Sequence, residues 1–390
     1  MARSRAISAG NLPVLMRSSL VASFAAACLL LAAPAASATP RDRTPQSPVG
    51  GPLLASDGVI VNPDAAAPAL PGGLDMGSWL VADADTGEVL AAKAPHRRFL
   101  PASTLKTLTA VTLLPLLDPT ATTKATQADA SVDGSKVGLV PGMSYTLDTL
   151  FTAMLVVSGN DAADALAEAA GGIPHTVDLM NAEALHLQAF DTLARTPSGL
   201  DAPGESTSAY DLALIARAGL ALPEFRHYVS IVRSTVPAPH HKHFEIYTHN
   251  RLLTTFPGDI GIKNGYTVKA GATYVGAATR NGHTIIVTLM NAPPYFWPQA
   301  KALLSWGFRA RGHVQPIGTL VGPAVAPTEQ RQVHARPVVA VGDTHRKDAF
   351  FGGEVPPWEV VMLATSAAVL VVVSTRRLRR RRSRLSLPPL

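Results

Sequence analysis

The hydrophobic pattern separates the two ends of the chain from its long middle region. Residues 20–33 and 360–373 are almost wholly apolar, whereas the region between them mixes short β-rich runs with helical ones. Residues 78–92 predict two strands around a turn, the Asn281-Gly282 pair predicts a hairpin, and a closing helix is expected at 297–309. Helical spacing dominates from about 104 to 222, and strands return from about 261 to 291. This order predicts an α/β (α+β) fold, with an antiparallel sheet flanked by helices and a helical insert.

Composition divides the middle region further. Residues 39–75 are rich in Pro, Ala and Gly and predict a flexible linker. Residues 76–312 are long enough for one hydrophobic core and are expected to form a single catalytic domain. Residues 313–357 are proline-rich and irregular, which predicts a stalk.

The N-terminal residues 1–38 predict a secretory signal peptide. Arginines at positions 3, 5 and 17 precede the apolar run, and Ala36-Ser37-Ala38 supplies a small-residue cleavage site. A permanent N-terminal membrane helix is the alternative. The only cysteine, Cys28, lies inside this segment, so a processed chain has no thiol for a disulfide or a cysteine nucleophile.

The C-terminal apolar run predicts a transmembrane helix at 358–375, at the short limit for spanning a bilayer. An arginine-rich tail at 376–390 follows, so we expect a cytoplasmic C-terminus on a single-pass protein of the cell membrane, with the folded domain outside the cytoplasm. The tail has seven arginines and the signal has three, so the two ends together carry more positive charge than the net +6 of the whole chain. The basic balance therefore gives no support to a nucleic-acid partner.

Three short motifs carry the candidate chemistry, and the first is Ser103-Thr104-Leu105-Lys106. Pro101 suits the first turn of a helix, so Lys106 is expected beside Ser103, three residues further along one helical face. A serine hydroxyl is a poor nucleophile until an adjacent base takes its proton, and a lysine can do so once burial and a second cation lower its pKa. The alternative is an ordinary amphipathic helix with a solvated lysine.

The other two motifs lie further along the chain. Ser158-Gly159-Asn160 is expected on a tight turn between two helices, where short polar side chains can point into a cleft. Its alternative is a capping turn that bonds only to local backbone. Lys263-Asn264-Gly265 opens the strand-rich region, with an ammonium that can bind a carboxylate and a glycine that permits close approach of a ligand. Here the alternative is an Asn-Gly turn with an incidental lysine.

In this order, the three motifs resemble those of the low-molecular-mass penicillin-binding proteins of the D-alanyl-D-alanine carboxypeptidase family, serine peptidases with an S-x-x-K motif. The resemblance covers roughly residues 78–312. It implies the penicillin-binding and β-lactamase-like transpeptidase fold, with no metal and no cofactor. Asn264 departs from the family, which usually has threonine there. Two further stretches also fit the family: Ser198-Gly199-Leu200-Asp201-Ala202-Pro203-Gly204 and Asn250-Arg251-Leu252-Leu253.

The resemblance also implies a role for each motif residue. Ser103 would form the acyl-enzyme, Lys106 would be the base, and Ser158 would pass the proton to the leaving D-alanine. The implied partners are peptidoglycan stem peptides that end in D-Ala-D-Ala and, as inhibitors, β-lactams. The remaining residues would bind substrate: Asn160 the peptide amide, Lys263 the terminal carboxylate with Thr267 as helper, Asn264 and Gly265 beside them, and the backbone N–H groups of Ser103 and Tyr266 the oxyanion.

The expected function is that of a membrane-anchored, penicillin-sensitive serine carboxypeptidase that removes the terminal D-alanine from peptidoglycan stem peptides. A β-lactamase is one alternative, although no Glu-x-x-Leu-Asn sequence lies between the second and third motifs. An inactive wall-binding protein is the other, and the intact Ser103/Lys106 pair disfavours it. The run His240-His241-Lys242-His243 lacks the pattern of a metal site and, between prolines, is expected in a solvated loop.

Overall fold

The structure is a computed structural model that describes residues 48–324 of the 390-residue chain. The predicted signal peptide (1–38), transmembrane helix (358–375) and arginine-rich tail (376–390) lie outside the described residues, as do parts of the predicted linker and stalk. Within 48–324, no helix is both long and apolar enough to cross a membrane.

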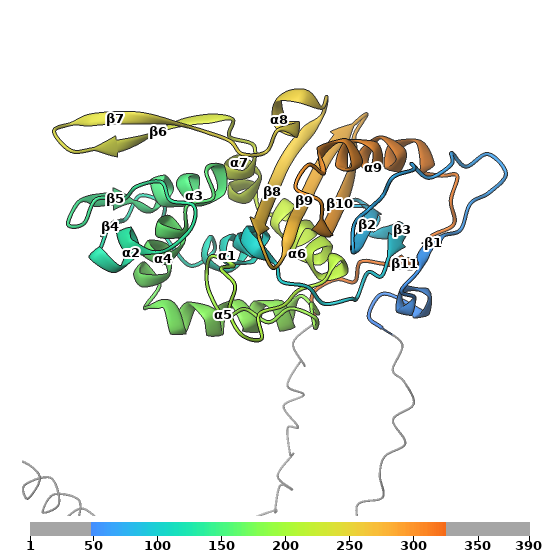
Figure 1. The fold of residues 1–390 in the computed structure, drawn as a ribbon, viewed down its shortest axis with the longest axis horizontal. Coiled ribbons are helices and arrows are strands. Elements are labelled where there is room, and N and C mark those ends of the chain that lie inside the picture. The colour runs from blue at the N-terminus through green and yellow to red at the C-terminus, as the bar shows by residue number, and fades with distance from the viewer. Residues whose placement is uncertain (1–47, 325–390) are drawn as a thin grey trace, which may run out of the picture. The chain divides into compact units, whose positions relative to one another are not determined.

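An antiparallel sheet of seven strands forms the centre of the described region (Figure 1). Its order is β1-β3-β2-β10-β9-β8, and β11 also pairs with β3. The strand that carries the third motif, β8, therefore lies at an edge of the sheet. The strands are β1 Val59–Val61, β2 Ser78–Asp83, β3 Glu88–Lys93, β8 Asp259–Thr267, β9 Gly271–Arg280, β10 His283–Ala292 and β11 Gly318–Thr319.

Both predicted hairpins are present, and their turn residues explain them. Between β9 and β10, Asn281 and Gly282 have φ angles of 50° and 78°. That left-handed pair is the arrangement an Asn-Gly hairpin turn favours. Between β2 and β3, the Asp83 carboxylate accepts hydrogen bonds from the backbone N–H groups of Asp85 (2.9 Å) and Thr86 (3.1 Å).

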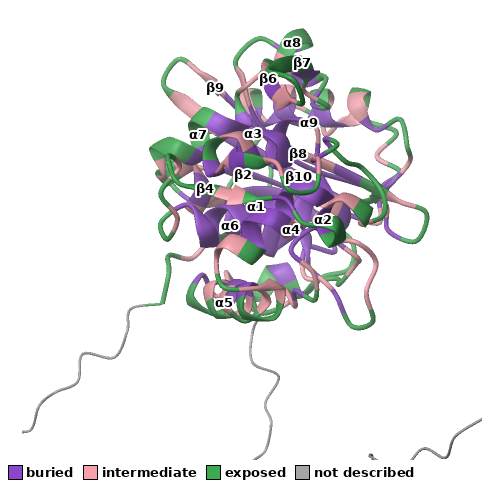
Figure 2. Cartoon of the chain, turned by 90° about the vertical axis from the view of Figure 1, so that its left-hand side faces the viewer, coloured by how far each residue is buried: buried purple, intermediate pink, exposed green. Residues whose placement is uncertain are grey.

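Helices cover both faces of the sheet and create two separate cores (Figures 1 and 2). Alternate residues of β10 face opposite sides: Ile285, Val287 and Leu289 pack in the core of α9, while Ile286 and Met290 pack in the core of α1 and α6. The helices are α1 Lys106–Leu113, α2 Gln127–Ser131, α3 Leu147–Val156, α4 Asn160–Ala169, α5 Ile173–His186, α6 Ala209–Ala221, α7 Pro223–Val229, α8 Leu252–Thr255 and α9 Trp297–Ala310, with 3-10 turns η1 Pro52–Ala55 and η2 Ala102–Leu105.

The helical insert lies between β3 and β8, as predicted, and carries two small two-stranded sheets. One pairs β4 (Thr122–Lys124) with β5 (Ser144–Thr146), and the other pairs β6 (Arg233–Ala238) with β7 (Lys242–Tyr247). The loop prediction for the histidine run was wrong in part. His240 and His241 form the turn of the second hairpin, but His243 belongs to β7. Among the hairpin residues only Val236 and Ile246 are buried, so the hydrophobic pattern is too weak to reveal the strands.

The folded region continues beyond the predicted boundaries of 76 and 312. Strand β1 lies in the predicted linker and pairs with β3, and Leu54 before it is buried in the core. Strand β11 lies in the predicted stalk, where Ile317 and Leu320 are buried as well. A few apolar residues within a Pro- and Gly-rich stretch are enough to add short strands to the sheet, although overall composition indicates a spacer.

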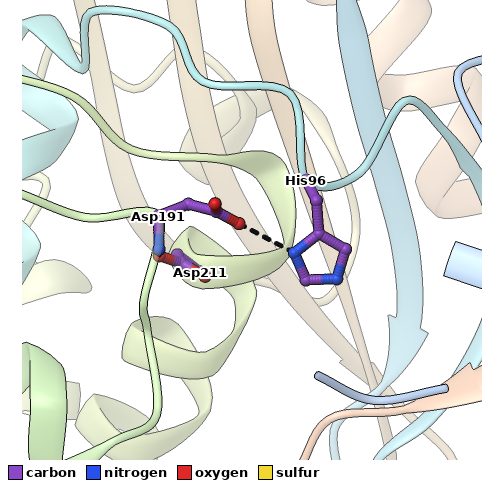
Figure 3. Close-up of side chains that lie close together, drawn as sticks. All are labelled: His96, Asp191 and Asp211. Atoms are coloured by element: carbon purple, nitrogen blue, oxygen red, sulfur yellow. Dashed lines mark hydrogen bonds and ion pairs between the residues drawn. The ribbon is translucent and has the colours of Figure 1, made fainter. Parts of the chain in front are cut away.

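A cluster of His96, Asp191 and Asp211 lies near the N-terminal and C-terminal segments of the described region (Figure 3). His96 Nδ1 lies 2.7 Å from Asp191 Oδ2, and its Nε2 lies 3.1 Å from the carbonyl oxygen of Val49. Both ring nitrogens thus face oxygen atoms that accept hydrogen bonds. The His96 ring packs on Tyr210, whose hydroxyl donates to the Thr319 carbonyl at 2.7 Å. One potential ligand atom from each of the three residues lies within 4.8 Å of the others, as in a metal site, but all three side chains are engaged in hydrogen bonds within the protein.

Candidate active site

Ser103 lies in η2, where it is accessible on an otherwise buried segment. Between Pro101 and Ala110, Ser103 is half-buried and all the remaining residues are buried. The preceding Ala102 has a φ of 47°, a left-handed conformation that residues with a side chain rarely adopt. The structure enforces it, because Gly199 packs so tightly on the Ala102 carbonyl that a Cβ at 199 would lie 1.9 Å from that oxygen. The nucleophile candidate therefore has a fixed backbone.

Lys106 is fully buried and makes three short contacts. Its Nζ lies 3.0 Å from Ser103 Oγ, 2.6 Å from Asn160 Oδ1 and 2.7 Å from the Ser198 carbonyl oxygen. Ser103 occupies a 3-10 turn and Lys106 is the first residue of α1, so the predicted single helix is two elements. The three-residue spacing still brings the amine to the hydroxyl.

Burial and a neighbouring cation favour a neutral amine at Lys106. Burial lowers the pKa of Lys106 well below its ordinary value, and the nearby charge of Lys263 lowers it further against opposing contributions from Asp164, Glu205 and Asp161. A neutral amine has two N–H bonds and one lone pair. The Asn160 oxygen and the Ser198 carbonyl can only accept, so they take the two N–H bonds. The lone pair then faces the Ser103 hydroxyl, the one partner of the three that can donate.

Asn160, the first residue of α4, orients this amine. Its Oδ1 accepts from Lys106, and its Nδ2 donates to the Asp133 carbonyl at 2.6 Å. The loop that presents this carbonyl is held by Asp161, whose carboxylate accepts from the N–H groups of Val137, Gly138 and Leu139 at 2.7–3.0 Å. Both polar atoms of Asn160 are engaged within the protein, which fits a role in positioning Lys106. The predicted contact of Asn160 with substrate stays a prediction.

Ser158 lies on the turn between α3 and α4, as the sequence predicts. Its φ is 63°, so Ser158 is, after Ala102, a second non-glycine residue of this site in the left-handed conformation. The residue is 5% exposed. Within residues 48–324, its hydroxyl makes no hydrogen bond, so it is available to a substrate or a leaving group.

Strand β8 brings the third motif against the first. A Cβ at Gly265 would lie 2.6 Å from Ser103 N and 3.1 Å from Ala102 Cβ, so only glycine fits between β8 and η2. The sequence predicts close approach of a ligand here, whereas the structure shows close approach of the Ser103 backbone. Lys263 is 1% exposed and donates to the Asn264 carbonyl at 2.6 Å. Burial lowers the pKa of Lys263 to about 7.

The remaining predicted residues of β8 face outward or sideways. Asn264, Gly265 and Tyr266 line a pocket of about 490 Å³ together with residues of the β7–α8 connection and the start of α9. Tyr266 is 56% exposed at its rim. Thr267 donates its hydroxyl to Asp201 Oδ1 at 2.7 Å, so its one O–H bond is already used inside the protein. A larger pocket of about 590 Å³ lies at α6 and α7, and its lining contains none of the motif residues.

Sequence reasoning missed the loop that carries Ser198. Glu205 Oε1 accepts from the N–H groups of Arg195 (3.2 Å) and Thr196 (3.1 Å) and from the Thr196 hydroxyl (3.0 Å), which fixes this loop against Lys106. Its Oε2 is buried and has no partner among the described residues, and burial raises the pKa of Glu205 to about 7. The stretch 198–204 carried part of the family resemblance, but a backbone carbonyl that binds an amine leaves no signal in residue type.

Comparison with known proteins agrees with the motifs and the fold. The sequence pattern of D-alanyl-D-alanine carboxypeptidases, peptidase family S11, matches residues 64–294, more than half of the chain. The chain belongs to this family. It is 42% identical over 238 residues to D-alanyl-D-alanine carboxypeptidase DacB2 of Mycobacterium tuberculosis, covering 59% of this chain and 81% of the relative. It is 34% identical over 272 residues to DacD of Salmonella typhimurium, covering 66% and 67%.

Solved structures give the same result. The D-alanyl-D-alanine carboxypeptidase of Mycobacterium tuberculosis H37Rv superposes with a TM-score of 0.62 at 39% identity, over 68% of this chain and all of that one. A mutant of the Streptomyces K15 DD-transpeptidase gives a TM-score of 0.59 at 25% identity, over 61% and 99%. The predicted family, serine peptidase class and fold are thereby confirmed.

Proposed function

We propose that this family member is a membrane-anchored, penicillin-sensitive serine carboxypeptidase that removes the terminal D-alanine from peptidoglycan stem peptides. The observation that carries the proposal is the environment of Lys106. It is a buried amine 3.0 Å from Ser103 Oγ, and its other two partners can only accept hydrogen bonds. This arrangement suits proton abstraction from the serine.

The proposed reaction has two steps. Ser103 Oγ attacks the carbonyl carbon between the two D-alanines while Lys106 Nζ takes the hydroxyl proton. The C–N bond then breaks, the D-alanine nitrogen receives a proton through the Ser158 hydroxyl, and an ester remains on Ser103. Water cleaves that ester, which releases the shortened peptide and restores the serine hydroxyl. Backbone N–H groups of Ser103 and Tyr266 are the proposed donors to the oxyanion.

The cellular location belongs to the proposal as well. The predicted signal peptide, the apolar run at 358–375 and the arginines after it support a domain outside the cytoplasm and a C-terminus inside it. A reporter that is active only in the cytoplasm, fused to the C-terminus, should be active. Activity of a reporter that works only outside the cytoplasm would contradict this orientation.

One assay separates the proposal from its two alternatives. The full chain in detergent is incubated with a peptide ending in D-Ala-D-Ala and, separately, with fluorescent penicillin. We expect release of D-alanine and a stable label. Labelling without D-alanine release would favour the inactive wall-binding protein, and rapid turnover of penicillin would favour a β-lactamase.

A further inference from the structure

The cavity of about 590 Å³ at α6 and α7 has the properties of a second binding site. Its volume is within the range of small-molecule sites in proteins. None of the three motifs contributes to its lining, and most of the lining is apolar. The apolar residues come from elements far apart in the sequence and include Leu187, Leu214, Ala218, Ile260 and Val321. A void walled in this way suits a ligand with an apolar body.

Arg217 of α6 brings to this cavity a positive charge that no anion balances. Its guanidinium donates only to backbone carbonyl oxygens, those of Ala84 (2.8 Å), Leu320 (3.0 Å) and Asp85 (3.4 Å). Among residues 48–324 it has no carboxylate partner. Arg217 is half-buried, so water screens its charge less than that of a surface arginine. An anion in the cavity would therefore be stabilised by this charge.

Arg226 is a second cation of the same cavity. It belongs to the last turn of α7, is exposed, and donates to the Leu220 carbonyl without forming an ion pair in the described part of the chain. The lining that the structure describes contains one carboxylate, Asp85. Its Oδ2 accepts from the Thr284 backbone N–H at 3.0 Å and lies 3.8 Å from His283 Nδ1. Two guanidinium groups against one carboxylate leave an excess of positive charge beside apolar walls.

The last described segment of the chain forms one wall of the cavity. Residues 321–323 belong to the lining, and the Gly322 carbonyl accepts from Gln188 Nε2 at 2.9 Å. Residues 325–357 connect this wall to the predicted transmembrane helix at 358–375. The wall is therefore continuous in sequence with the segment that leads to the proposed membrane anchor.

We propose that this cavity binds a single acyl chain with an anionic head group, the chemistry of a fatty acid or of one chain of an anionic phospholipid. The acyl chain occupies the apolar part of the cavity. The head group receives hydrogen bonds from Arg226, because a guanidinium pairs its N–H bonds with a carboxylate or a phosphate. Arg217 contributes its charge, since its bonds to carbonyl oxygens fix it in place. This inference goes beyond the proposed function and uses only its membrane location.

The probe for the test is palmitic acid with a photoreactive diazirine on its chain, added to the full chain in a non-ionic detergent. After illumination and digestion, mass spectrometry locates the labelled peptides. We expect label in the peptides that contain residues 214–226 or 321–323. Unlabelled palmitate should compete at least about 10-fold more strongly than hexadecanol, because the neutral head group gains no charged hydrogen bond. Competition by palmitate alone identifies a free fatty acid, and competition by phosphatidylglycerol as well identifies a phospholipid chain; both results support the inference.

Three variants locate the site. Arg226→Gln should weaken competition by palmitate about 10-fold, through loss of the charged hydrogen bond. Arg309→Gln is the matched control, because Arg309 is also an exposed arginine in the last turn of a helix but does not line the cavity. Ala218→Trp places an indole in the cavity and should remove the label, with a thermal melt to show that the chain stays folded.

Three results would overturn the inference. They are label confined to peptides outside the cavity, equal competition by palmitate and hexadecanol, and wild-type competition by palmitate in Arg226→Gln. The last two decide the matter even if Ala218→Trp fails to fold, since Arg226 is exposed and its replacement disturbs no core packing.

Discussion

Gly265→Ala tests whether β8 and the nucleophile are packed as tightly as the structure indicates. The added Cβ would lie 2.6 Å from Ser103 N and 2.7 Å from Thr273 Oγ1, both shorter than real Cβ contacts. Gly265 itself is not in the left-handed region, so alanine meets no backbone strain and the effect is steric alone.

The size of the effect follows from this overlap. Ordinary contacts begin near 3.4 Å, so β8 and η2 must separate by several tenths of an ångström. Overpacking of this kind costs about 1–3 kcal/mol of unfolding free energy. A misplacement of about 1 Å at a reacting group costs roughly 100-fold in rate. The displacement here is somewhat smaller, so we expect kcat/KM for D-alanine release to fall by about 10- to 100-fold while the protein stays folded.

The assay is D-alanine release together with a thermal melt, with Gly72→Ala as the control. Gly72 has open space around its Cβ position and no left-handed φ, so alanine should be neutral there. If Gly265→Ala had the kcat/KM and melting temperature of the wild type, the close packing of the third motif on Ser103 would be refuted.

Three further substitutions test the surroundings of the site. Lys106→Met should reduce D-alanine release by about 10²- to 10⁴-fold without unfolding the chain, and retained activity would exclude this base. Glu205→Gln should move the acidic limb of the pH profile of kcat/KM to lower pH, since an ionised Glu205 raises the pKa of Lys106; an unchanged profile would refute the coupling. His96→Gln should lower the unfolding free energy by about 1–3 kcal/mol, measured by denaturant titration, because it removes the hydrogen bonds of the ring to Asp191 and to the Val49 carbonyl; unchanged stability would argue against a stabilising role of this cluster.

Glu205 also makes stability depend on pH. Its pKa of about 7 in the folded chain exceeds the ordinary value of 4.5, so the folded state binds more protons than the unfolded state between those two values. The contribution of this group is therefore full below about pH 4.5 and is lost as the pH rises to about 7. Glu205→Gln should flatten that part of the stability profile. A curve that runs parallel to that of the wild type would contradict the assignment.

The side chains proposed to act in the reaction were candidates from the sequence alone, and their roles stay predictions. Ser103 and Lys106 are three residues apart, so local geometry alone brings them together. That the strand with Lys263 and Gly265 packs beside Ser103 could be predicted only from the resemblance to the family, because these segments lie 160 residues apart in the sequence. Neither the hydroxyl of Thr267 nor the amide of Asn160 could be known in advance to be engaged inside the protein.

One backbone contact in the site and two short strands could not be predicted from the sequence, for physical reasons. The Ser198 carbonyl binds Lys106 through a backbone atom that every residue type possesses. Strands β1 and β11 are two or three residues long, and such short strands give no periodic pattern.

Mapping the covalent adduct on the full chain tests the central claim most directly. The protein is quenched in acid during turnover of a D-Ala-D-Ala peptide, digested, and searched by mass spectrometry for the acyl group. We predict an ester on Ser103 that is absent from Lys106→Met. An adduct on another residue, or an undiminished adduct without the lysine, would contradict it.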